Sequence, residues 1–141
     1  FKKILLPKSI FIKVKNCNEI KEIALKDINM IKDKDFIIVD FSLSSETINI
    51  LKDTVLNEGR LFMSGSPSFC REGHYHASNH IIKYFNQNHK NSILLGGNTV
   101  EEIESIATKS SGGGAALEYI CNKSLVILDA LRNNRKNFNI Q

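Results

Sequence analysis

The sequence has few of the residues that mark several common protein classes. Its three cysteines (Cys17, Cys70 and Cys121) are widely spaced and form no CxxC pair, which argues against a disulfide framework and fits a reducing compartment. Aromatic residues make up 8%, and no RNA-recognition pattern is present, so nucleic acid is not an expected partner. No apolar run reaches the ~18–20 residues of a membrane-spanning helix. We therefore expect a cytoplasmic or organellar chain without a membrane partner.

The residues that are present fit one small domain. The chain has 141 residues, of which 42% are hydrophobic and 24% charged, enough for a single core. The net charge of +4 permits an anionic ligand without demanding one. The first residue is Phe1, from which we expect a processed or truncated product.

The first half of the chain combines short apolar runs with one helical pattern. Residues 4–6 and 10–14 are β-rich, and residues 19–31 suit either a helix or an irregular strand. The continuous apolar run 36–41 contains one acid and is typical of a buried parallel strand. Hydroxyl residues at 42–46 then predict the start of a helix that runs to Gly59.

The second half repeats a theme of apolar strand, glycine or serine turn, and helix. The theme predicts a mixed α/β fold with a mainly parallel, Rossmann-like sheet, whose ligand sites lie at the carboxyl ends of the strands. We expect a domain over residues 1–131 and a loose polar tail over 132–141. The expected strands are 61–63 and 93–95, the turns 64–67, 96–99 and 110–114, and the helices 74–85, 100–106 and 115–121.

Three glycine turns are the strongest chemical signal in the residues themselves, and two of them directly precede a helical pattern. Gly96 and Gly97 precede one helical pattern, and Gly112, Gly113 and Gly114 precede another. Glycine lets the backbone approach a ligand closely, and a helix start offers amide groups that suit phosphate. Neither turn is a P-loop or a GxGxxG motif, and an ordinary turn is the alternative interpretation.

Five segments, in order, resemble the phosphoglycerate kinase family. The most specific is SSGGGAALEYICNKSL (residues 110–125), which resembles the family's STGGGASLELLEGKxL. The other four are ILLGGNTVEEIE (93–104), MSGSPSFCREGHY (63–75), FIIVDFSLSSETINI (36–50) and KILLPKSIFI (3–12). The resemblance covers about residues 3–131, nearly the whole chain.

The resemblance implies part of that kinase's C-terminal, nucleotide-binding domain. The family transfers a phosphoryl group between 1,3-bisphosphoglycerate and ADP, with Mg²⁺ bound to the nucleotide, largely by positioning and charge stabilisation. Carried over by position, Gly112, Gly113 and Gly114 would be catalytic and face the transferred group, and Asn98 would stand at the metal-binding aspartate. The implied nucleotide-binding residues are Val39 at the adenine, Gly65 and Phe69 at the nucleoside, Gly96, Gly97, Asn98 and Thr99 at the phosphates, and Glu72 beside the ribose position.

Several departures from the family pattern leave two hypotheses open. Asn98 replaces an aspartate, which weakens a Mg²⁺ site; Arg71 replaces the ribose-binding glutamate; and Ile38 replaces a glycine, so a branched side chain would fill the adenine pocket. Ser64 and Ser66 alter the NGP turn, and the GGAKVxxK segment and the N-terminal substrate half are missing. In the first hypothesis, the chain is a kinase fragment or subunit that binds Mg-ADP or Mg-ATP but is inactive alone, and its partner is the missing half or another subunit. In the second hypothesis, the chain is a degenerate relative with a structural or interaction role.

Three further features have ordinary interpretations. Cys70, His74, His76 and His80 could share a metal, but their spacing matches no familiar zinc pattern, and a polar helix face is the better interpretation. Arg132, Arg135 and Lys136 indicate a solvated basic terminus. Cys121 is expected to be a packed cysteine rather than an activated thiol.

Overall fold

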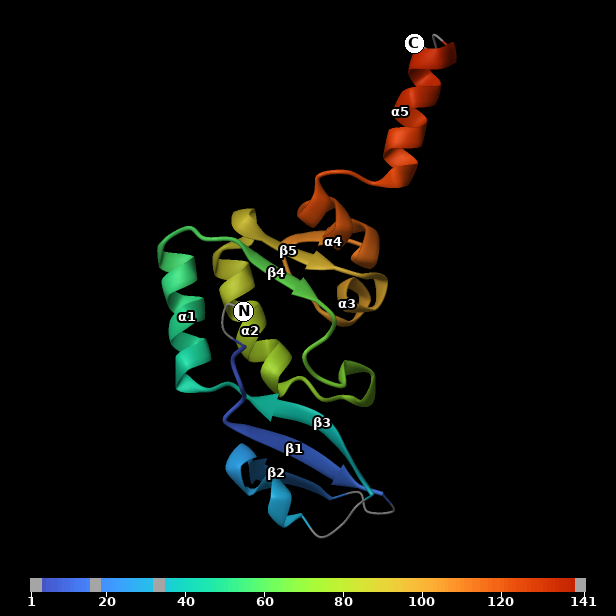
Figure 1. The fold of residues 1–141 in the computed structure, drawn as a ribbon. Helices are drawn as coiled ribbons and strands as arrows, with labels where there is room; N and C mark the ends of the chain where they lie inside the picture. Colours follow the sequence, from blue (N-terminus) through green and yellow to red (C-terminus); the bar gives the residue numbers. More distant parts are fainter. Residues whose placement is uncertain (1–3, 16–18, 32–34, 139–141) are drawn as a thin grey trace.

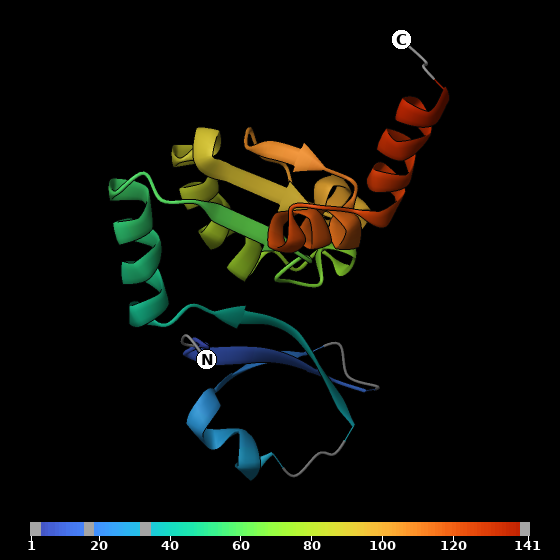
Figure 2. The ribbon, with the colours of Figure 1, turned by 45° about the horizontal axis from the view of Figure 1, so that its top comes forward.

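The computed structural model describes residues 4–15, 19–31 and 35–138, with side chains as far as residue 135. Cys17 lies outside these residues. The described chain forms two three-stranded sheets, which Figure 2 shows one below the other. It is a mixed α/β fold in which only the second sheet is parallel.

Sheet A is antiparallel, with the order β2-β1-β3. Its strands are β1 (Ser9–Val14), β2 (Ile20–Ala24) and β3 (Phe36–Ser42), and the 3₁₀ helix η1 (Leu25–Met30) follows β2. The ambiguous segment 19–31 is therefore half strand and half 3₁₀ helix, and residues 4–6 form no strand.

The prediction of a buried parallel strand at 36–41 is wrong. β3 pairs antiparallel with β1, and Ile37 and Ile38 are 47% and 44% exposed. A continuous apolar run usually marks a strand covered on both faces, but here the strand lies at the edge of a small sheet. The expectation of a mainly parallel sheet fails for the same reason, because three of the six strands belong to sheet A.

Sheet B is parallel, with the order β4-β5-β6. Its strands are β4 (Leu61–Ser64), β5 (Ser92–Leu95) and β6 (Thr108–Ser110). Around it lie α1 (Ser45–Leu56), η2 (Cys70–Glu72), α2 (His76–Gln87), η3 (His89–Asn91), α3 (Gly97–Glu102) and α4 (Gly113–Asn122), which Figure 1 labels in part. The order of strand, glycine turn and helix is thus confirmed for this half of the chain. The bounds of one helix differ from the prediction, because α3 begins at Gly97, inside the predicted turn 96–99, and ends at Glu102 instead of residue 106.

The main core lies on one face of sheet B. Leu61, Met63 and Leu94 point from the strands toward Phe85 of α2, and all four are at most 8% exposed. Ile103 and Ala107 complete the buried cluster, and α1 adds apolar side chains to its margin. The helix start predicted for α1 is confirmed, because the Ser44 hydroxyl accepts a hydrogen bond from the Thr47 amide at 3.2 Å.

The C-terminal helix α5 (Val126–Phe138) projects away from the rest of the molecule (Figure 1). The expected boundary at residue 131 falls inside this helix, which continues through the predicted polar tail as far as Phe138. Val126, Ile127 and Leu131 on it are 82%, 69% and 59% exposed.

Candidate functional site

The candidate site lies where β4 and β5 end. In a parallel sheet the carboxyl ends of neighbouring strands meet at one edge, which is where ligands commonly bind. Here that edge borders a cavity of about 310 Å³. The lining residues are Gly65, Ser66, Ser68, Phe69 and Arg71 after β4, and Asn98, Thr99 and Glu102 from α3. Four of the positions predicted to bind a nucleotide, namely Gly65, Phe69, Asn98 and Thr99, are therefore brought together.

Thr99 holds the two turns against each other. Its side chain is 2% exposed, and its Oγ1 accepts a hydrogen bond from the Gly65 amide at 3.0 Å. Gly65 has φ +100°, a conformation that side chains rarely adopt. Thr99, which was predicted to contact phosphate, therefore links the turn after β4 to α3.

Arg71 dominates the polar end of the cavity. Its Nη2 donates to Asn98 Oδ1 at 2.8 Å, and its Nε donates to Glu102 Oε1 at 2.7 Å. Ser66 Oγ also donates to Glu102 Oε2. Arg71 is 65% exposed in its side chain, whereas Glu102 is 15% exposed. The guanidinium thus lies at the mouth, where it is held by two partners and open to solvent.

The side chains around the cavity are not a suitable set of ligands for a Mg²⁺ ion bound by the protein. That ion favours anionic oxygen ligands, but Asn98 is neutral and its oxygen already accepts from Arg71. Among the described lining residues the only carboxylate is Glu102, and both of its oxygens accept hydrogen bonds. A cationic guanidinium between these groups opposes a second cation.

The two glycine turns touch each other at the same edge of the sheet. A Cβ placed on Gly113 would lie 3.1 Å from Gly96 Cα, and Gly96 has φ +103°. The amides of Gly96, Gly112 and Gly113 already donate, to Ser110 O at 2.8 Å, Ser110 Oγ at 3.3 Å and Ser111 O at 3.0 Å respectively. Gly112, Gly113 and Gly114 lie next to the cavity's loops without lining the cavity itself. Tight packing of the turns thus accounts for at least part of the glycine pattern.

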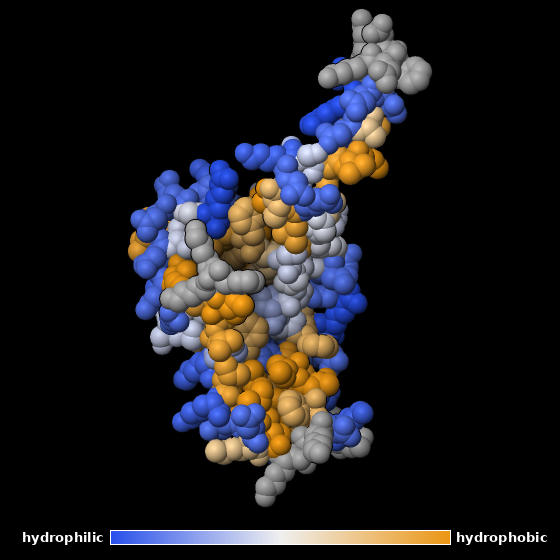
Figure 3. Space-filling model, in the orientation of Figure 1, coloured by the Kyte–Doolittle hydropathy of each residue, from blue (hydrophilic) through white to orange (hydrophobic). Residues whose placement is uncertain are grey.

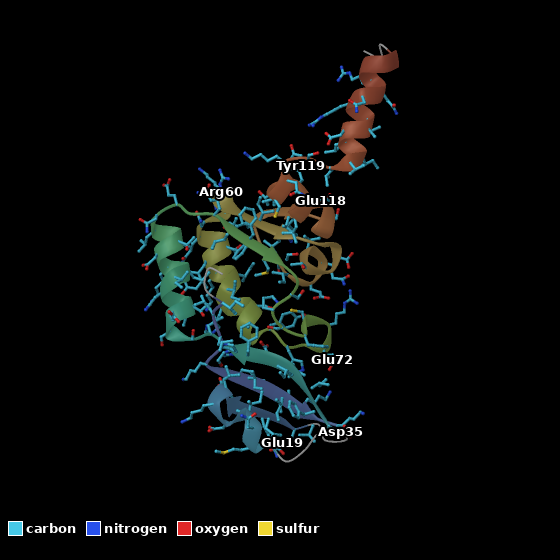
Figure 4. The ribbon with its side chains drawn as sticks, viewed as in Figure 1. Glu19, Asp35, Arg60, Glu72, Glu118 and Tyr119 are labelled. Carbon is cyan, nitrogen blue, oxygen red and sulfur yellow. The ribbon has the colours of Figure 1, made fainter. Side chains whose placement is uncertain are left out.

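Several other predicted positions also lie outside the cavity lining, among them Gly96 and Gly97 at the start of α3. Val39 is 1% exposed inside β3, where its carbonyl accepts from the Phe69 amide at 3.0 Å and supports the ring that lines the cavity. Ile38, on the other face of β3, lines a separate apolar groove with Leu5 and Phe41 instead of filling the candidate site. Glu72 turns toward sheet A (Figure 4), where its carboxylate lies 3.7 Å from Lys13 Nζ.

Asp40 is the residue that sequence reasoning missed. It is 4% exposed and accepts from Ser68 Oγ at 2.8 Å, the Ala77 amide at 3.0 Å and the His76 amide at 2.7 Å. It thereby caps the start of α2 and ties β3 to the loop that carries Phe69. Its position as the one acid in the apolar run 36–41 could have indicated this role, because a buried carboxylate needs hydrogen-bond partners.

The remaining polar candidates have structural surroundings. The rings of His76 and His80 stack with centroids 4.8 Å apart, and within the described residues no group of three or more His, Cys, Asp or Glu side chains is arranged to hold a metal. Cys70 is buried beside Ser78 Oγ at 3.5 Å. Cys121 is exposed, so the expectation of a packed cysteine there is wrong.

Comparison with known proteins adds no assignment. No protein-family model matches the sequence, and no curated protein matches it significantly. Within the residues that the structure describes, no helix has both the length and the apolar character needed to cross a bilayer.

Proposed function

We propose that this chain is a nucleotide-binding domain of the phosphoglycerate kinase type, which binds ADP or ATP at the cavity between β4 and α3. The observation that carries the proposal is the convergence of two separate motifs. The turn after β4 and the segment 96–99 after β5 each resemble a nucleotide-binding segment of that family, and both contribute residues to one cavity, the second through Asn98 and Thr99. Its volume of about 310 Å³ lies at the lower end of the ~300–1,000 Å³ typical of small-molecule sites.

Arg71 is the residue that we assign to the nucleotide's phosphates. A guanidinium can bind phosphate oxygens through two parallel hydrogen bonds, and Arg71 is the cation at the cavity mouth. Phe69, which is 51% exposed on the same cavity, offers a ring face to the base. Because Glu102, the one carboxylate among the described lining residues, already accepts hydrogen bonds through both oxygens, Mg²⁺ would come with the nucleotide.

In the reaction that the resemblance implies, a terminal phosphate oxygen of ADP takes the phosphoryl group from an acyl phosphate, and the carboxylate leaves. The chain's part is to bind and orient the nucleotide. The N-terminal half that binds phosphoglycerate in the family is not among these residues. We therefore expect no turnover by the 141 residues alone, and ATP formation from 1,3-bisphosphoglycerate in a coupled assay would contradict that expectation.

Calorimetric titration of ADP into the folded chain tests the binding proposal. We expect a dissociation constant between micromolar and low millimolar. In Arg71→Met it should rise about tenfold or more, since a charge-assisted hydrogen bond contributes about 1.5–3 kcal/mol. Arg132→Met on α5 is the matched control, and it should bind like the unaltered chain. Equal binding by Arg71→Met and the unaltered chain would contradict the assignment of Arg71.

The second candidate function is a non-catalytic interaction domain. The observation that favours it is the internal use of the site's polar groups, because Arg71, Asn98 and Glu102 satisfy one another. A folded chain that binds neither ADP nor ATP would favour this alternative.

A further inference from the structure

A second hollow lies at the opposite end of sheet B from the candidate site. It has a volume of about 460 Å³ and borders the first residues of the strands. The pairing of Phe62 with Ile93, and of Ile93 with Thr108, puts these three side chains on one face. α4 covers the far part of that face, where Leu95 is 1% exposed, and leaves this end open. Figure 3 shows a hollow in this region, with apolar residues inside it and hydrophilic ones along its upper rim.

The floor of this groove is apolar and partly aromatic. Phe62 from β4 is 44% exposed, and Tyr119 and Ile120 from α4 are each 43% exposed. Exposed apolar groups gathered in a concave surface indicate a binding site more strongly than the same groups scattered singly. The two rings offer flat surfaces to a flat ligand.

Three cations surround the floor: Arg60, Lys90 and Lys123. Two side-chain amides hold together the loops that carry Arg60 and Lys90. Asn88 Nδ2 donates to Gly59 O at 2.6 Å, and Asn91 Nδ2 donates to Glu58 O at 3.2 Å. No acidic side chain lines the groove, and no ion pair engages any of the three cations within the described part of the chain.

Lys123 is placed at the groove by an unusual backbone conformation. It ends α4 with φ +56°, and its amide donates to Tyr119 O at 2.8 Å. Glycine is the residue that normally takes this left-handed position, because a Cβ is unfavourable there. A lysine at this position directs a cation to the groove's rim at some cost to folding.

We propose that this groove binds a small organic anion with a flat, aromatic or otherwise apolar body and a carboxylate, sulfonate or phosphate group. The apolar body would lie on Phe62 and Tyr119, and the anionic group would meet Arg60 and Lys123. Charge complementarity favours an anion, since three unpaired cations crowd one rim. The proposal does not depend on nucleotide binding at the other end of the sheet.

Fluorescence titration with 8-anilinonaphthalene-1-sulfonate, an aromatic sulfonate, tests the proposal on the whole chain. We expect binding of one probe that weakens with added salt. We also expect it to weaken about two- to fivefold in Lys123→Gly and again in Arg60→Gln, as surface charge pairs of about 0.5–1 kcal/mol predict. N-phenyl-1-naphthylamine, the neutral counterpart, should bind these variants and the unaltered chain equally. Lys83→Gln, an exposed lysine of α2 outside the groove, is the matched control.

Lys123→Gly also distinguishes a loss of sulfonate binding from a loss of folding. Glycine relieves the left-handed backbone, so this variant should have a higher melting temperature than the unaltered chain while it binds the sulfonate less well. The other apolar groove, lined by Leu5, Ile38 and Ile81, has no lysine or arginine among those of its lining residues that the structure describes. It contains neither Arg60 nor Lys123, so binding there would not respond to these changes. Unchanged sulfonate affinity in the Arg60→Gln, Lys123→Gly double variant, or an equal loss in Lys83→Gln, would overturn the proposal.

Discussion

Removal of the buried Asp40 carboxylate should destabilise the protein severely. In Asp40→Ala the Ser68 hydroxyl and the His76 and Ala77 amides lose their acceptor in a region that is largely shielded from water. Each unsatisfied buried group costs about 1–3 kcal/mol, and the effects of groups in one network do not simply add. We therefore expect a loss of about 3–5 kcal/mol, a large share of the ~5–15 kcal/mol by which native proteins are stable.

Urea unfolding, followed by far-ultraviolet circular dichroism, measures this loss. Asp40→Asn keeps one oxygen acceptor and the size of the side chain, so its loss of unfolding free energy should be about half as large. Asp53→Ala, at an exposed position of α1, should change the unfolding free energy by no more than about 0.5 kcal/mol. A loss below about 1 kcal/mol in Asp40→Ala would refute the reasoning that this carboxylate joins β3 to α2.

Three further predictions concern stability. Gly113→Ala should destabilise the protein by about 1 kcal/mol or more, because its Cβ would lie 3.1 Å from the glycine turn after β5. Gly114→Ala, whose Cβ meets nothing within 4 Å, should instead stabilise α4 by about 0.5–1 kcal/mol; urea midpoints of the two variants in the opposite order would contradict this. Lys123→Gly should raise the unfolding free energy by about 1 kcal/mol, and a lower melting temperature would count against a strained left-handed lysine. The Ser9 hydroxyl donates to Glu22 at 2.5 Å and is the main cause that lowers the pKa of Glu22 below its ordinary value. Since the folded-state pKa is depressed, this stabilisation is present above the ordinary pKa of a glutamate and is lost as the pH falls through the lower folded-state pKa. The urea midpoint of Glu22→Gln should therefore fall less on acidification than that of the unaltered chain.

Local signals in the sequence predicted the parts of the fold that local chemistry decides. The hydroxyl at Ser44 starts α1 as expected, and the glycine turns after β4 and β5 lie between strand and helix. The direction of β3 was not predictable from its apolar run, since the pairing with β1 fixes it. The helical character of residues 132–138 was missed because their polar composition is equally typical of a solvated tail.

The candidate site was predictable in its position but not in its contacts. Glycine patterns pointed to the edge of sheet B where the cavity lies. They could not show that Gly113 packs on Gly96, or that Arg71 joins Asn98 to Glu102, because these contacts link residues far apart in the sequence. The groove at the other end of the sheet was missed for the same reason, since Arg60, Lys90 and Lys123 meet only in the fold.

An amide chemical-shift map of the isotope-labelled chain during titration with ADP, with and without Mg²⁺, tests nucleotide binding at the cavity directly. We expect saturable shifts at Gly65, Phe69 and Asn98 in both conditions, because no carboxylate among the described lining residues is available to a metal. Shifts confined to Phe62 and Ile93 would place ADP in the groove instead, and no shifts at all in a folded chain would contradict nucleotide binding.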